Sequence, residues 1–336
     1  MFSAAKILKN DPEPESSDGP PDGELRNESQ WQKLEAVAGG LARVIRGKDD
    51  VIESILTALL AEGSVLLEDV PGVGKTTMAK AVAKLIDLDF QRVQCTPDLL
   101  PADILGSSIY QPSTGQFEFR AGPVFCHLLV ADEVNRASPR TQSALLEAMA
   151  ESQVTIDGSR HQLQRPFMVI ATQNPIGFAG TFPLPESQLD RFLFRLKMDY
   201  PDASSEVDLL VDQATTEPVD SLAAVMTTDE LRALQSQTRR THVDRKVAAY
   251  VVALASATRQ DSRLTIGCSP RGCKMLLRGA QGQAVLRGRD HVLPDDVQAI
   301  AVAALSHRVT VKQALADSET TSAIIGSILD STEIPM

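Results

Sequence analysis

The feature that most constrains the fold is a short apolar run, SVLL at 64–67, which is followed by the turn PGVGKTT and a helix-forming stretch. A buried strand that enters a helix through a glycine-rich turn is typical of a parallel sheet with helical crossovers. Gly72 and Gly74 permit φ > 0 and let another group approach the main chain closely. The amides of such a turn and of the helix N-terminus together form a cradle for phosphate.

The turn nearly matches the phosphate-binding pattern G-x-x-x-x-G-K-S/T, in which the lysine reaches the outer phosphates and the hydroxyl reaches Mg²⁺. Asp69 replaces the first glycine. That position only lets the chain leave the strand, and aspartate tolerates turn conformations better than most residues. A turn that binds nothing is the alternative, which the Gly-Lys-Thr ending disfavours. The expected nucleotide-binding residues are Gly72, Val73, Gly74, Lys75, Thr76 and Thr77.

Further short apolar runs alternate with helical stretches along the first two thirds of the chain. They lie at 89–95, 127–133, 167–173 and 192–198. This alternation predicts an α/β fold with a parallel sheet covered by helices on both faces. Two insertions stand out, an aromatic-bearing segment at 108–125 and a run at 153–163 whose Asp157-Gly158 pair signals a hairpin.

Composition divides the chain into three parts. Residues 11–25 hold six acidic residues and no basic one, so 1–28 is expected to be a disordered acidic tail. Residues 29–202 form the predicted α/β nucleotide-binding subdomain, and 203–336 are expected to hold helices only. The net charge of −11 argues against a nucleic-acid surface.

Membrane and metal sites are not expected either. No apolar run approaches the length of a membrane span, and the first residues lack the apolar core of a secretion signal, so a cytoplasmic protein is the default. The four cysteines form no C-x-x-C pair and have no further metal ligands at suitable spacing. We expect them to be reduced thiols that are mostly buried.

Polar residues follow the apolar runs where ligands bind in parallel sheets, beyond the carboxyl ends of the strands. Asp132 is suited to hold the magnesium shell, and Glu133 to polarise a water that attacks the γ-phosphate. Asn174 follows the next run and could orient that water, although an asparagine before proline is more often a turn residue.

Two arginines complete the set of candidate site residues. Arg191, in the stretch PESQLDRF, is expected in a polar helix ahead of the next strand, where it could be a solvated residue or the partner of Asp190. Arg271 follows Ser269-Pro270, which predicts an N-cap and a first helical residue. An arginine gains nothing from the helix dipole in a first turn, which suggests an external anion or a structural ion pair.

Five segments follow one another along the chain in the order PGVGKT, LLVADEVNRA, ATQNP, LPESQLDRF and SPR. Together they resemble the motifs of the MoxR family of AAA+ ATPases, and the resemblance covers roughly 30–330. The resemblance implies an AAA+ P-loop module with a helical lid, and a homo-oligomeric ring, usually a hexamer. It implies Walker A at 72–77, Walker B at Asp132 and Glu133, sensor 1 at Asn174, an arginine finger at Arg191 and sensor 2 at Arg271.

The resemblance further implies a Mg²⁺-dependent ATPase that acts as a chaperone-like remodeller. Proteins of this kind mature or assemble client proteins, often together with a von Willebrand factor A domain protein. In this branch of the fold the two insertions project towards the pore of the ring. ATP and Mg²⁺ are therefore the expected ligands.

A nucleic-acid-tracking AAA+ motor is the alternative, because helicases share this branch of the fold. Such a pore should present several basic residues, whereas the two insertions offer only Arg120 and Arg160. A guanine-nucleotide switch lacks an N-K-x-D motif. A scaffold without turnover is disfavoured by the presence of Glu133.

Replacing Asp69 by glycine should leave ATPase activity within a few-fold of the parent, because the phosphate cradle begins later in the turn. Steady-state kinetics on Asp69→Gly, with Lys75→Ala as the reference for a lost cradle, would check this. A loss of ATP affinity as large as that of Lys75→Ala would place Asp69 in the site.

Overall fold

The computed structural model describes residues 28–68, 74–173, 180–200, 218–312 and 318–335. The predicted acidic tail, apart from its last residue, and the predicted boundary at 202/203 lie outside these ranges. The division of the chain at 28 and 202 therefore stays a prediction. Asp69, Gly72, Val73 and Asn174 also lie outside the described residues.

A five-stranded sheet forms the centre of the molecule. All its described neighbours pair in parallel, as predicted. The five strands, in their spatial order, are β2 (Phe90–Gln94), β5 (Leu128–Asp132), β8 (Met168–Gln173), β1 (Val65–Glu68) and β9 (Phe194–Leu196).

Alternate side chains of the central strands point to opposite faces of the sheet, and both sets are apolar. On β5, Leu128 and Val130 join the cluster that includes α3 (Lys75–Leu85). Leu129 and Ala131 join a second cluster, which includes α5 (Pro139–Glu151). Burial of both faces explains why these strands are continuous apolar runs rather than alternating ones.

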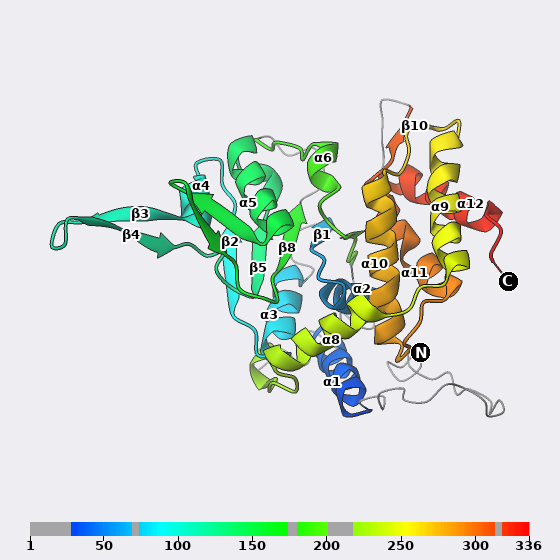
Figure 1. Ribbon diagram of the computed structural model, residues 1–336, viewed down its shortest axis with the longest axis horizontal. Coiled ribbons are helices and arrows are strands. Elements are labelled where there is room, and N and C mark those ends of the chain that lie inside the picture. The colour runs from blue at the N-terminus through cyan, green and yellow to red at the C-terminus, as the bar shows by residue number, and fades with distance from the viewer. Residues whose placement is uncertain (1–27, 69–73, 174–179, 201–217, 313–317, 336) are drawn as a thin grey trace.

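The remaining helices of the first part of the chain pack around this sheet (Figure 1). Two longer helices precede β1, and the other helical segments are one or two turns long. They are α1 (Glu28–Val44), α2 (Asp49–Leu60), α4 (Pro101–Leu105), η2 (Val134–Arg136) and α6 (Glu186–Leu189).

The described region after residue 217, which we call the lid, lies beside β9 and α2 (Figure 1). It is mostly helical, and its helices are η3 (Pro218–Ser221), α8 (Thr228–Arg240), α9 (Arg245–Gln260), α10 (Pro270–Leu286), α11 (Pro294–Leu305) and α12 (Ser318–Ser331). The expectation of helices alone needs one correction. An antiparallel ribbon joins β10 (Leu264–Ile266) to β11 (Thr310–Val311). Only Leu264 of β10 is buried, so the ribbon left no periodic apolar signal in the sequence.

The lid packs tightly against the sheet subdomain through α10 and α2. A Cβ at Gly282 would lie 2.7 Å from the carbonyl oxygen of Thr57, so any larger residue would push the two helices apart. The neighbouring Gln283 accepts a 2.5 Å hydrogen bond from the Thr57 hydroxyl. Apolar lid residues such as Leu276 share one buried cluster with β1 residues such as Val65. The lid and the sheet subdomain are therefore joined through a common core.

The two insertions are β-hairpins. β3 (Gly106–Gln111) pairs with β4 (Gln116–Ala121), and this hairpin extends away from the body of the molecule, at the left of Figure 1. β6 (Gln153–Ile156) pairs with β7 (Ser159–Gln162) through a turn in which Asp157 and Gly158 have φ of 50° and 78°. The predicted Asp-Gly hairpin is confirmed.

The four cysteines are free thiols, and Cys273 is the most exposed of them. Burial raises the pKa of Cys126 to about 12, despite backbone hydrogen bonds that oppose the rise. The described residues contain no group of three or more metal-ligating side chains. Among the helices of the described ranges, none combines the length and apolar character that a membrane crossing needs.

Candidate nucleotide site and a separate pair of arginines

The first turn of α3 approaches the carboxyl end of β5. Gly74, the N-cap of α3, has φ of 91°, a left-handed conformation that favours glycine. Lys75 is buried and directly follows Gly74. Both residues therefore lie at the helix N-terminus, where the first main-chain amides have no acceptor within the helix. The Thr76 hydroxyl lies 3.5 Å from Asp132 Oδ2. The structure thus brings Asp132 to the Gly74–Thr76 turn, residues that the sequence assigned to one site.

The Asp132 carboxylate is buried and held on both oxygens. Its Oδ1 accepts a 2.7 Å hydrogen bond from the Thr172 hydroxyl on β8. Its Oδ2 accepts from Arg92 on β2, at 2.9 Å from Nε and 2.6 Å from a terminal nitrogen. Strands β2 and β8 flank β5, so the two partners reach Asp132 from both sides.

Glu133 begins the turn after β5 in a left-handed conformation, with φ of 54° and ψ of 50°. Its amide donates a 2.9 Å hydrogen bond to the Thr172 hydroxyl, which also binds Asp132. The Glu133 carboxylate pairs with Arg136 at 2.9 Å. The two adjacent acids therefore have different environments, although they follow each other in the chain.

The buried thiol of Cys95 lies near this pair of acids. Its amide donates a hydrogen bond to the Asp132 carbonyl at 2.8 Å. Burial, and secondarily the charges of Asp132 and Glu133, raise the pKa of the Cys95 thiol to about 12. A thiol with that pKa is protonated near neutral pH, so Cys95 is not a nucleophile here.

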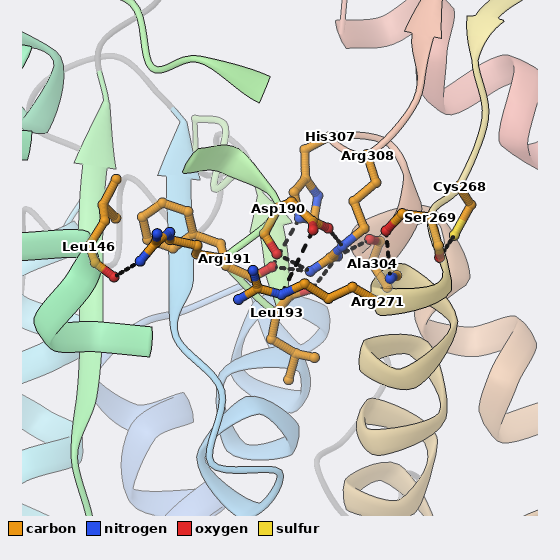
Figure 2. Close-up of polar contacts among 12 residues, drawn as sticks. Leu146, Asp190, Arg191, Leu193, Cys268, Ser269, Arg271, Ala304, His307 and Arg308 are labelled. Atoms are coloured by element: carbon orange, nitrogen blue, oxygen red, sulfur yellow. Dashed lines mark hydrogen bonds and ion pairs between the residues drawn. The ribbon is translucent and has the colours of Figure 1, made fainter. Parts of the chain in front are cut away.

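Arg191 lies at the other end of the sheet. The sequence suggested a helix around this residue, but α6 ends at Leu189, and Arg191 stands in the short link that leads to β9. Its guanidinium donates a 2.8 Å hydrogen bond to the carbonyl of Leu146 on α5. The suggested pairing with Asp190 is replaced by other partners of that carboxylate (Figure 2).

Arg271 stands in the first turn of α10, after the N-cap Ser269, as predicted. The Ser269 hydroxyl accepts a 3.1 Å hydrogen bond from the Gly272 amide. The Arg271 side chain is 46% exposed, and its Nε lies 3.8 Å from Asp190 Oδ2. Asp190 Oδ1 accepts a closer bond, at 2.8 Å, from the buried Arg308 of the lid. Figure 2 shows Arg271 and Arg308 converging on Asp190, while Arg191 points towards Leu146.

Arg191 and Arg271 line one cavity, together with a third arginine, Arg165. Ser64 and Phe167 also line it, and they directly precede β1 and β8. The cavity therefore lies at the amino ends of the strands. Asp132 and Glu133 lie at and after the carboxyl end of β5, so the sequence-predicted residues form two groups at opposite ends of the sheet.

Sequence reasoning missed Arg92, Thr172 and Arg308. Arg92 lies within a strand whose residues alternate between faces, and nothing in the sequence says that this strand borders β5. Thr172 is a hydroxyl inside an otherwise apolar run, a signal that becomes specific only when the neighbouring strand ends in Asp132. Arg308 is far along the chain from Asp190, and its burial shows only in the fold.

Comparison with known proteins identifies two domains and several relatives. The model of the ATPase family associated with various cellular activities (AAA) matches residues 64–194, and the AAA lid domain matches 256–328. The chain is 47% identical to the uncharacterized protein YeaC of Bacillus subtilis, over 88% of this chain and 92% of the relative. It is 37% identical to Chaperone MoxR1 of Mycobacterium tuberculosis, over 95% and 86%.

Two further similarities agree with these. Protein MoxR of Methylorubrum extorquens is 31% identical over 80% of this chain and 85% of its own length. A crystal structure of a candidate ATPase from Cytophaga hutchinsonii superposes with a TM-score of 0.84 at 35% identity, covering 93% of this chain and 98% of that one. The similarity thus extends over both the sheet subdomain and the lid.

Replacing Thr172 by valine should weaken the site, because one hydroxyl orients Asp132 and satisfies the Glu133 amide. We expect a loss of about 1–3 kcal/mol in the free energy of unfolding, the cost of leaving buried polar groups unpaired. If Asp132 holds Mg²⁺, as the sequence predicts, the apparent Mg²⁺ affinity in an ATPase assay should also fall about 10–100-fold, because a partner that orients the carboxylate is lost. Urea unfolding and Mg²⁺ titrations would measure both.

Thr172→Ser, which keeps the hydroxyl, is the matched control and should stay near the parent in both measurements. Parent-like values for Thr172→Val would contradict the orienting role.

Proposed function

Because the chain belongs to the MoxR family of AAA+ ATPases, we propose that it hydrolyses ATP with Mg²⁺ and acts as a ring-shaped, chaperone-like remodeller of client proteins. The observation that carries this proposal is the separation of the candidate residues. Lys75, Asp132 and Glu133 lie near one end of the sheet, and Arg191 and Arg271 line a cavity at the other. A complete site then needs residues from two subunits.

The described residues at the carboxyl end of β5 fit a magnesium nucleotide. The α3 amides and the buried Lys75 offer positive charge, and the Thr76 hydroxyl and Asp132 carboxylate stand 3.5 Å apart with oxygen atoms suited to Mg²⁺. Bound Mg²⁺ would neutralise negative charge on the phosphates. In the proposed site Lys75 binds the outer phosphates, and Thr76 and Asp132 hold the metal. Gly72, Val73 and Thr77 would complete the cradle.

Glu133 is the proposed base that takes a proton from the attacking water. Its carboxylate and that of Asp132 have different partners, so one acid can serve the metal while the other serves the water. In the present structure Arg136 holds the Glu133 carboxylate and Arg92 holds Asp132. Both carboxylates are thus paired with cations. Asn174 keeps its expected role in orienting the water.

Arg191 and Arg271 are proposed to act on the nucleotide of a neighbouring subunit. A planar guanidinium can neutralise charge that develops on a transferred phosphoryl group. The two side chains share one cavity with Arg165, and the one carboxylate of its lining, Glu62, is paired with Arg239 and Arg278, an arrangement that suits an anion. Their distance from Asp132 along the sheet supports the assignment in trans for both.

The proposal extends to the oligomeric state and to the protein partners. The relatives named Chaperone MoxR1 and Protein MoxR support a chaperone-like role for this chain. We infer a homo-oligomeric ring, with six subunits as the expected number. A client protein and a von Willebrand factor A domain protein are the expected partners. A Glu133→Gln variant that binds ATP without turnover would be the means to capture them.

The trans assignment of Arg191 can be tested by mixing two inactive variants. Arg191→Ala should bind ATP nearly normally but turn over about 10³-fold more slowly, because an arginine finger acts mainly on the transition state. Glu133→Gln should also bind without turnover, with its defect in its own site. In mixed rings, some interfaces combine an intact Glu133 with an intact Arg191. ATPase activity should therefore recover with a dependence on the mixing ratio.

Subunit exchange, followed by energy transfer between labelled variants, would verify that mixed rings form. If mixed rings form and no ratio restores turnover, Arg191 does not act in trans.

Single- or double-stranded DNA should change neither the ATPase rate nor the assembly state at moderate salt. The exposed aromatics of the β3–β4 hairpin, Tyr110 and Phe117, are accompanied by one basic residue, Arg120. Stimulation by DNA that declines steeply with salt would instead support the nucleic-acid motor. ATPase assays and light scattering with and without DNA would decide between these functions.

A further inference from the structure

We propose that Arg308 of the lid is a positioning residue for Arg191, because it holds the chain segment 190–193, which we call the finger segment, in a buried clamp. The inference rests on the proposed role of Arg191 as an arginine finger. Arg308 does not itself reach the nucleotide of a neighbouring subunit in this proposal. It fixes where Arg191 and Arg271 stand.

The contacts of Arg308 converge on the main chain of the finger segment. Its guanidinium donates to Asp190 Oδ1 at 2.8 Å, to the Asp190 carbonyl at 3.2 Å and to the Leu193 carbonyl at 3.1 Å. It also donates to the carbonyls of Phe192 and, within the lid, Ala304. One side chain therefore ties three residues of the link between α6 and β9 to the end of α11 (Figure 2).

The neighbouring His307 adds a second tie. Its Nε2 lies 3.1 Å from the Phe192 carbonyl, and since the carbonyl can only accept, the Nε2–H donates. Burial, and secondarily the charge of Arg308, hold the pKa of His307 well below its usual value, so the ring is neutral. Two successive lid residues thus bind three of the carbonyls of the finger segment, those of Asp190, Phe192 and Leu193.

The clamp is stiff because its charges are removed from water. The Arg308 side chain is 1% exposed and that of Asp190 is 22% exposed. A guanidinium presents its donors in a rigid planar fork, so the acceptors it binds are fixed relative to one another. The amides of the segment donate to the carbonyls of Glu186, Gln188, Leu189 and Ser64, and the side chains of Phe192 and Leu193 are buried. Arg308 supplies the complementary bonds on the acceptor side, so its loss would free the Asp190 carboxylate and the Asp190 and Leu193 carbonyls from these restraints.

Asp190 extends the same clamp to the second arginine of the cavity. Its Oδ2 faces Arg271 Nε at 3.8 Å while its Oδ1 binds Arg308. Arg191 follows Asp190 directly in the chain. A rotation of the lid must therefore carry the finger segment with it or break a buried ion pair. In this proposal, Arg191 and Arg271 therefore move together with the lid.

The test uses the full chain with Arg308→Met and Arg308→Lys. Arg308→Met should keep the ATP affinity of the parent but lose about 100-fold in kcat, the effect expected when a catalytic group is displaced by about 1 Å. Arg308→Lys keeps the charge beside Asp190 but loses the fork, so its kcat should lie between the two, with KM unchanged. If Arg308→Met fails to fold, Arg308→Lys carries the test alone.

Mixed rings give the readout that separates positioning from a general defect. An Arg308 variant should recover activity when mixed with Glu133→Gln, which supplies an intact finger. It should not recover when mixed with Arg191→Ala, because both subunits then present a defective finger. The matched control is Arg287→Met, which removes another lid arginine that pairs with the sheet subdomain, at Glu53. Its kcat should remain close to that of the parent.

Each contrary result has a distinct meaning. If Glu133→Gln restores Arg191→Ala but not the Arg308 variants, Arg308 does not act through the finger and the inference fails. The inference also fails if Arg287→Met reproduces the kinetic loss, since general loosening of the lid would then explain it. If Glu133→Gln does not restore Arg191→Ala in rings that form, the proposed function of Arg191 fails instead.

Discussion

Both faces of the central sheet are sealed by apolar side chains, and this burial decides where polar chemistry can occur. Leu128 and Val130 face one helical layer, and Leu129 and Ala131 face the other. An unpaired charge between the layers would be costly, so charged groups gather where the strands end. The sheet has two such ends, and each holds one of the two groups of candidate residues.

At the carboxyl end of β5, the order of the strands determines which side chains surround Asp132. Strand β5 lies between β2 and β8, so Asp132 receives one partner from each neighbour. Arg92 supplies the opposite charge, and Thr172 joins the Asp132 side chain to the Glu133 main chain. Removal of Arg92 or Thr172 takes away one of the partners of the buried Asp132 carboxylate. Such a network therefore depends on all of its members being in place.

The sequence could predict the features that depend on neighbouring residues. The strand runs, the Asp157-Gly158 hairpin and the Ser269-Pro270 helix start are local patterns, and the structure has all three. The roles of Thr172 and Arg308 could not be predicted, because each depends on a partner brought near only by the fold. The β10–β11 ribbon was missed for a related reason, since its short, mostly exposed strands carry no periodic signal. The role of Asn174 in orienting the water stays a prediction, because this residue lies outside the described residues.

The backbone of Glu133 implies a trade-off between stability and activity. A residue with a Cβ at φ of 54° and ψ of 50° is strained, and glycine or asparagine would adopt this conformation at lower cost. A glycine or asparagine at 133 would thus favour the folded state while removing the proposed base. With Glu133 as the proposed base, selection for stability and selection for turnover would favour different residues at this position. Libraries screened only for thermal resistance should therefore enrich variants that have lost turnover at this position.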